Sequence, residues 1–106
     1  MEDKVTMDEL ILNVTEWAYE KGLLKRDNAD KQFMKVIEEL GETAAAVLKN
    51  KESETEDGLG DVFVTLIILT TQLGYTPQEC LLAAWNEIKD RKGKTKDGIF
   101  IKESDQ

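Results

Sequence analysis

Two short acidic segments contain the side chains of this sequence that are best suited to chemistry. They are Glu38-Glu39-Leu40-Gly41-Glu42 and Asp57-Gly58-Leu59-Gly60-Asp61. On a helix, Glu39 lies about 60° from Glu42, and Glu38 about 40°, so the three carboxylates can converge. Carboxylates held close together repel one another, and they usually supply hard oxygen ligands to Mg²⁺, Mn²⁺ or Ca²⁺. The two segments therefore predict a site for a divalent cation.

An ordinary explanation competes with the metal site. Acids in the EExxE pattern often form only the solvated face of a helix in an acidic protein. Asp57 and Asp61 are spaced i,i+4 and share one face of an otherwise apolar helix. The helix dipole explains Asp57 in a first turn better than Asp61, which lies a turn deeper and directly precedes Val62. A carboxylate near a buried position is usually paired or metal-bound, so we favour the metal site.

The composition narrows the possible chemistry. The chain has 106 residues, no histidine and one cysteine, Cys80. Without histidine, Ser-His-Asp and Cys-His catalysis and the ordinary zinc sites are excluded. Cys80 has no partner for an internal disulfide, and we expect it to be a small buried hydrophobe. Catalysis is then left to carboxylates, lysine or water activated by a metal ion.

The charge distribution limits the partners. A net charge of −8, from 22 acidic and 14 basic residues, argues against binding to nucleic-acid polymers or anionic membranes. No apolar run reaches the length of about 18 residues that a membrane helix needs. The initial Met1-Glu2-Asp3-Lys4 lacks the basic and apolar blocks of a signal peptide. We therefore expect a cytoplasmic protein without a membrane partner.

Capping signals and apolar periodicity predict four helices and a short arm. The helices are expected from Thr6 to Gly22, at about 28–48, at about 56–72 after a capping box at Ser53-Glu54-Thr55-Glu56, and at about 77–92 after Thr76-Pro77-Gln78-Glu79. The arm, at about 94–103, has a turn at Lys96-Asp97-Gly98 and is β-prone beyond it. We expect one all-α domain over residues 1–106, with this arm at its C-terminal end.

The third expected helix is apolar nearly all round. Its apolar residues are Val62, Phe63, Val64, Leu66, Ile67, Ile68 and Leu69. A helix of this kind belongs in the centre of a bundle, and so small a domain lacks the helices to cover it on every side. We therefore expect a four-helix bundle that is completed by oligomerisation, as a homodimer or a homotetramer.

Three segments resemble the motifs of a known family, the MazG-like nucleoside triphosphate pyrophosphohydrolases of the short phage and bacterial type. Ile37-Glu38-Glu39-Leu40-Gly41-Glu42 followed by Ala44-Ala45-Ala46 is similar to the first motif, EExxE, and Leu59-Gly60-Asp61-Val62 to the second, ExxD. Asn86-Glu87-Ile88-Lys89-Asp90-Arg91-Lys92-Gly93 resembles the downstream segment that meets nucleotide phosphates. The resemblance covers about 17–92 and continues through the arm. It implies an all-α, oligomeric, Mg²⁺-dependent enzyme that converts a nucleoside triphosphate to the monophosphate and pyrophosphate.

The resemblance also implies roles for particular acids. Glu39, Glu42 and Asp61 are implied to be ligands of Mg²⁺, or of Mn²⁺ in its place, and Glu38 is a peripheral candidate and the nominal general base. Where ExxD has its glutamate, this chain has Gly58. Asp57, one residue earlier, can replace that ligand if its side chain leans across or the start of the helix is wound differently. The same glycine can instead mark a lost site.

Other residues are candidates for binding the substrate. Lys89 and Arg91 can bind phosphates through their charges, and Asn86 through hydrogen bonds. Their ordinary alternative is the exposed side of a last helix. Trp17 and Trp85 offer faces on which a base can stack, although Trp17 lies on an apolar stripe that favours core packing.

Three functional hypotheses remain open. The leading one is a nucleoside triphosphate pyrophosphohydrolase. The second is a MazG-like nucleotide-binding or regulatory protein with a degraded metal site, suggested by Gly58. The third is a helical oligomerisation or interaction module whose acids only maintain solubility.

Overall fold

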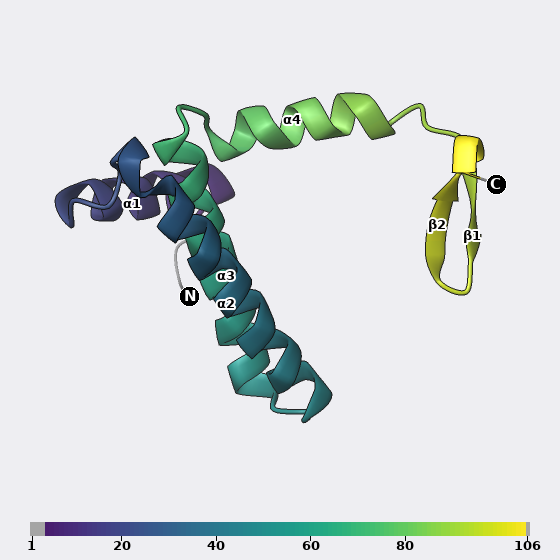
Figure 1. Ribbon diagram of the computed structural model, residues 1–106, viewed down its shortest axis with the longest axis horizontal. Coiled ribbons are helices and arrows are strands. Elements are labelled where there is room, and N and C mark those ends of the chain that lie inside the picture. Colours follow the sequence, from purple (N-terminus) through teal and green to yellow (C-terminus); the bar gives the residue numbers. More distant parts are fainter. Residues whose placement is uncertain (1–3, 106) are drawn as a thin grey trace.

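The computed structural model describes residues 4–105, and over this range the protein is mostly helical. Figure 1 shows four α-helices followed by a small hairpin. The elements are α1 (Met7–Glu20), η1 (Arg26–Asn28), α2 (Ala29–Leu48), α3 (Glu52–Gln72), α4 (Pro77–Ile88), β1 (Gly93–Lys96), β2 (Ile99–Lys102) and η2 (Glu103–Asp105). The expected helical class is therefore confirmed.

Two of the predicted helix starts are confirmed in detail. The Thr6 hydroxyl accepts a hydrogen bond from the Glu9 amide at 3.1 Å and caps α1. At α4, Thr76 and Glu79 form a complete capping box, in which each side chain accepts from the backbone amide of the other, and Pro77 stands at the first helical position. At both helix starts, backbone amide groups that have no acceptor within the helix thus donate hydrogen bonds to side chains.

The predicted start of the third helix is wrong. Helix α3 begins at Glu52 instead of about residue 56, and Lys51 precedes it without a side-chain cap. Asp57 and Asp61 therefore lie beyond the first turn, where the helix dipole no longer explains them. Gly58 lies inside a continuous helix with an ordinary negative φ, so no locally rewound helix start surrounds Asp57. Helix α4 is also shorter than expected, because it ends at Ile88.

Helices α2 and α3 form an antiparallel pair that holds most of the core (Figure 1). A Cβ atom at Gly58 would lie 2.5 Å from the Thr43 hydroxyl oxygen, so glycine permits the close approach of the two helices. Farther along the pair, the Gln32 amide nitrogen donates to the Thr65 carbonyl oxygen at 3.1 Å. Among the described residues, the buried ones are Ala18, Val36, Thr43, Ala46, Thr65, Ile67, Ile68, Leu69 and Gln72.

Helix α3 is central, as predicted, because it contacts α1, α2 and α4. However, α4 projects away from the pair (Figure 1), and none of its residues is buried. The radius of gyration is 16.6 Å, whereas a compact domain of this length has about 13 Å. The four helices of one chain therefore do not close around a single core. Completion of the bundle by a second subunit stays a prediction.

The C-terminal arm is an antiparallel hairpin. Strand β1 pairs with β2, with Gly93 opposite Lys102 and Lys96 opposite Ile99. Asp97 and Gly98 form the turn, and both have positive φ, 53° and 78°. Two positive φ values match the type of turn that joins twisted strands through two residues. The predicted β-prone arm and its turn are confirmed.

No single helix among the described residues has the length and apolar character needed to cross a membrane. Helices α3 and α4 meet that requirement only jointly, as a pair bent by 97° at the break between them. The expectation drawn from Met1-Glu2-Asp3-Lys4 falls mainly on residues 1–3, which lie outside the described range.

Candidate functional site

Carboxylates from two helices surround one pocket of about 310 Å³ between α2 and α3. Glu39 and Glu42 reach it from α2, and Asp57 and Asp61 from α3. The structure thus brings together the four acids that the sequence singled out as metal ligands. Their role as ligands stays a prediction. The rest of the lining is formed by Thr43, Ala45, Ala46, Lys49, Lys51, Glu54 and Gly58.

The close contact at Gly58 positions this pocket. Because Gly58 has no side chain, α3 can approach Thr43, whose hydroxyl donates to the Glu39 carbonyl oxygen at 2.7 Å. The acidic faces of both helices then border the same space. The close packing of α3 against Thr43 therefore accounts for glycine at position 58, where the ExxD motif has a glutamate.

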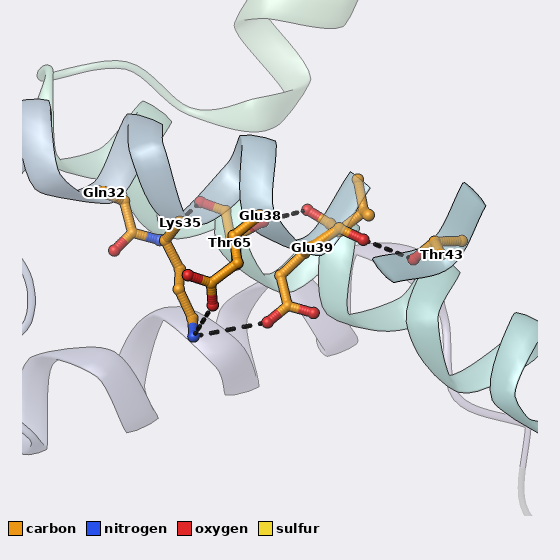
Figure 2. Close-up of polar contacts among 7 residues, drawn as sticks. Gln32, Lys35, Glu38, Glu39, Thr43 and Thr65 are labelled. Atoms are coloured by element: carbon orange, nitrogen blue, oxygen red, sulfur yellow. Dashed lines mark hydrogen bonds and ion pairs between the residues drawn. The ribbon is translucent and has the colours of Figure 1, made fainter. Parts of the chain in front are cut away.

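Lys35 provides a positive charge beside the acids. Its Nζ donates to Glu38 Oε1 at 3.1 Å and lies 3.6 Å from Glu39 Oε1. Figure 2 shows both carboxylates turned toward this ammonium group. The hydrogen bond and the charge of Glu38, with a smaller effect from Glu39, raise the pKa of Lys35 above its ordinary value.

The four acids are not equivalent in exposure. The Glu39 side chain is only 14% exposed, whereas Glu42, Asp57 and Asp61 are exposed residues. Glu38 lines neither of the two pockets described here and pairs with Lys35 at the surface, with 57% of its side chain exposed. This position gives no support to Glu38 as the general base. It makes Glu38 a partner of Lys35.

The residues fit a divalent cation by their chemical type. Carboxylate oxygens from two helices face one pocket, as a hard cation requires, and the Lys35 ammonium already pairs as a cation with Glu38 and Glu39. Over residues 4–105, no three acidic side chains converge closely enough to hold an ion in their present conformations. Binding would thus require rotation of the exposed Glu42, Asp57 or Asp61, which their exposure permits.

A larger pocket of about 610 Å³ adjoins the acidic one. Glu39 and Asp61 line both pockets, so these two carboxylates stand at the border between them. The larger pocket is completed by Trp17, Leu23, Asn28, Lys31, Gln32, Lys35, Val64, Thr65, Ile68 and Gln72. It combines apolar surface with two lysines and three side-chain amides beside the candidate metal ligands.

Trp17 differs from the packing expected for it. The residue is 48% exposed and lines the larger pocket, so the expectation that Trp17 packs in the core was wrong.

The sequence analysis did not identify Lys31 and Lys35 as candidate site residues, although their spacing gave a signal. They are spaced i,i+4, and Lys35 precedes Glu38 and Glu39 by three and four residues, which places these side chains on one helical face.

The structure leaves the expected phosphate-binding residues apart from both pockets. Asn86, Lys89 and Arg91 are exposed, and none of them lines either pocket. Helix α4 leads away from the α2–α3 pair, and Lys89 and Arg91 follow its end (Figure 1).

Cys80, which lies on α4, is exposed, so the expectation that it is buried was wrong.

Comparison with known proteins gives one informative similarity. The chain is 39% identical over 66 residues to an uncharacterised 18.2 kDa protein from the rep-hol intergenic region of Haemophilus phage HP1. The aligned stretch covers 62% of this chain and 40% of the phage protein, so the chain spans less than half of that relative. No protein-family model matches the chain. No solved structure matches it either.

Proposed function

We propose that this protein is a Mg²⁺-dependent nucleoside triphosphate pyrophosphohydrolase of the MazG-like kind. It would hydrolyse its substrate between the α and β phosphorus atoms and release a monophosphate and pyrophosphate. One observation carries this proposal: Glu39 and Asp61 stand at the border between an acidic pocket and a larger, partly apolar pocket. A metal-bound triphosphate attached to a nucleoside needs these two environments side by side.

The acidic pocket supports the binding of the cation. Glu39, Glu42 and Asp61 are the proposed ligands, and Asp57 is the proposed replacement for the carboxylate missing at Gly58. When bound, Mg²⁺ or Mn²⁺ supplies electrostatic stabilisation of phosphoryl oxygens and lowers the pKa of water. The protein itself holds Glu39 in place, because its side chain is mostly covered while the other acids remain free to adjust.

The larger pocket supports the binding of the nucleoside. A pocket of about 610 Å³ lies within the size range of small-molecule sites, about 300–1,000 Å³. Trp17 offers an aromatic face there, and Val64 and Ile68 offer apolar surface. Gln32 and Asn28 add polar groups that can distinguish one ligand from another.

A second subunit fits the remaining observations. Leu81, Leu82, Trp85 and Ile88 form an exposed apolar face on α4, and contiguous apolar surface of this kind marks an interaction site. Asn86, Lys89 and Arg91 do not reach the pockets of their own chain. We propose a homodimer or homotetramer in which α4 of one copy brings these three residues toward the phosphates bound by another copy.

Calorimetry tests the proposal against its two alternatives. Metal-free protein is titrated first with Mg²⁺ and then with a panel of nucleoside triphosphates, and the products are separated. A pyrophosphohydrolase binds both and releases pyrophosphate, whereas a degraded site binds without turnover. An interaction module binds neither ligand, and that result would reject the proposal together with its binding-only variant.

A further inference from the structure

Lys35 stands where the two pockets meet. It lines the larger pocket together with Glu39 and Asp61. Its ammonium group lies 3.1 Å from Glu38 Oε1 and 3.6 Å from Glu39 Oε1 (Figure 2). The same positive charge therefore touches a proposed metal ligand and borders the space proposed for the substrate.

We infer that Lys35 exchanges partners when the site is loaded. Without a divalent cation it pairs with Glu38 and Glu39, and once the cation takes Glu39, the ammonium group turns to the phosphate oxygens of the bound anion. This inference rests on the proposed function, from which it takes the cation and the polyphosphate ligand. It adds a positioning residue that the family resemblance did not indicate.

The first step follows from competition for Glu39. An ammonium group and a divalent cation on the same carboxylate repel each other, and the divalent cation carries twice the charge. The ion pair of Lys35 is weakly held, because 52% of the lysine side chain is exposed and exposed pairs contribute little. Lys35 is therefore the partner that leaves.

The second step follows from reach and charge. Lysine has a flexible four-carbon stem with three rotatable donors, so its ammonium group can move without a change in the backbone. Lys35 already lines the larger pocket, where a polyphosphate bound to the cation attracts it. This movement fixes the direction of the substrate: the phosphates lie at the border formed by Glu39 and Asp61, and the nucleoside lies toward Trp17.

The chain offers a matched control in Lys31. Lys31 lies one turn before Lys35 on α2 and lines the same pocket, yet within the described residues it forms no ion pair with a carboxylate. Lys31→Met and Lys35→Met remove the same charge from the same helix. If Lys35→Met changes an affinity more than Lys31→Met does, the difference is therefore due to the contacts of Lys35. The loss of one positive charge from α2 is common to both variants and cannot explain it.

The test measures two affinities by calorimetry. For Mg²⁺ alone, Lys35→Met should bind about threefold more tightly than the wild type, because the competing ammonium group is gone. For inorganic pyrophosphate at saturating Mg²⁺, the same variant should bind about tenfold more weakly, because a charge-assisted hydrogen bond is lost. Lys31→Met should stay within about twofold of the wild type for Mg²⁺, and Lys35→Arg should restore both values toward the wild type.

The opposite signs of the two changes make the inference falsifiable. Unchanged or weaker Mg²⁺ binding by Lys35→Met would overturn it, as would equal effects of Lys31→Met and Lys35→Met. Pyrophosphate binding by Lys35→Met that is as tight as that of the wild type would also overturn it. In each of these cases Mg²⁺ binding by the wild type would leave the proposed function standing. A wild-type protein that binds no Mg²⁺ would reject both.

Discussion

Gly58→Ala tests the contact that brings the two acidic helices together. The added Cβ would lie 2.5 Å from the Thr43 hydroxyl oxygen, 3.2 Å from Thr43 Cβ and 3.3 Å from Thr43 Cγ2. Thr43 is only 6% exposed, so it has little space into which it can move. Overpacking of this kind costs about 1–3 kcal/mol, and the better helix propensity of alanine returns about 0.5–1 kcal/mol. We expect a net loss of up to about 2.5 kcal/mol in the free energy of unfolding.

Gly60→Ala is the control for that substitution. Gly60 lies in the same helix, and a Cβ there would meet nothing within 4 Å. This variant gains only the helix propensity and should be more stable than the wild type by about 0.5–1 kcal/mol. Urea denaturation followed by circular dichroism at a fixed protein concentration measures both variants, since the stability of an oligomer depends on concentration.

A double substitution tests the cause of the loss. Thr43→Ala removes the two atoms that Gly58→Ala would meet at 2.5 Å and 3.3 Å, and it leaves only the contact of 3.2 Å. The pair Thr43→Ala/Gly58→Ala should therefore be more stable than the sum of the two single changes predicts. If Gly58→Ala were as stable as Gly60→Ala, the packing explanation of Gly58 would be refuted. The explanation also predicts that Gly58→Glu, which recreates the ExxD pattern, destabilises the protein instead of restoring a site.

Two further substitutions test the ligand set and the assembly. Asp57→Asn should lower Mg²⁺-dependent pyrophosphate release nearly as much as Asp61→Asn, because both carboxylates line the acidic pocket; full activity in Asp57→Asn would show that Asp57 does not replace the missing ligand. Leu81→Glu should shift the sedimentation coefficient toward that of a monomer while the helical signal stays unchanged, because Leu81 is 72% exposed within one chain. A wild-type protein that sediments as a monomer at micromolar concentration would contradict the proposed assembly.

The sequence predicted the local signals of this fold better than its packing. The caps at Thr6 and Thr76 and the turn at Asp97-Gly98 depend on neighbouring residues only, and all three were found. The start of α3 was misplaced, because the acidic stretch before Glu56 contained a capping pattern that the helix does not use. Without a side-chain cap, the start of α3 carries only the weaker signal of two acidic residues in its first turn, Glu52 and Glu54.

For the candidate site too, the sequence predicted what depends on local spacing and missed what depends on packing between helices. The spacing of Glu39 with Glu42, and of Asp57 with Asp61, identified acids that the structure places around one pocket. The reason for Gly58 was not predictable, because it depends on Thr43 of another helix. The larger pocket was missed for a similar reason, since α1, α2 and α3 build it together. Residues far apart in sequence become a pocket only through the packing of their helices.

Pyrophosphate release tests the central claim most directly. Wild-type protein and Asp61→Asn are incubated with canonical and modified nucleoside triphosphates, in Mg²⁺ and in excess chelator, and both products are quantified. The proposed function predicts equal amounts of monophosphate and pyrophosphate from the wild type in Mg²⁺, none in chelator, and a loss of at least about 100-fold in Asp61→Asn, comparable to the removal of a group that stabilises a transition state. The release of inorganic phosphate in place of pyrophosphate, or an Asp61→Asn variant as active as the wild type, would contradict it.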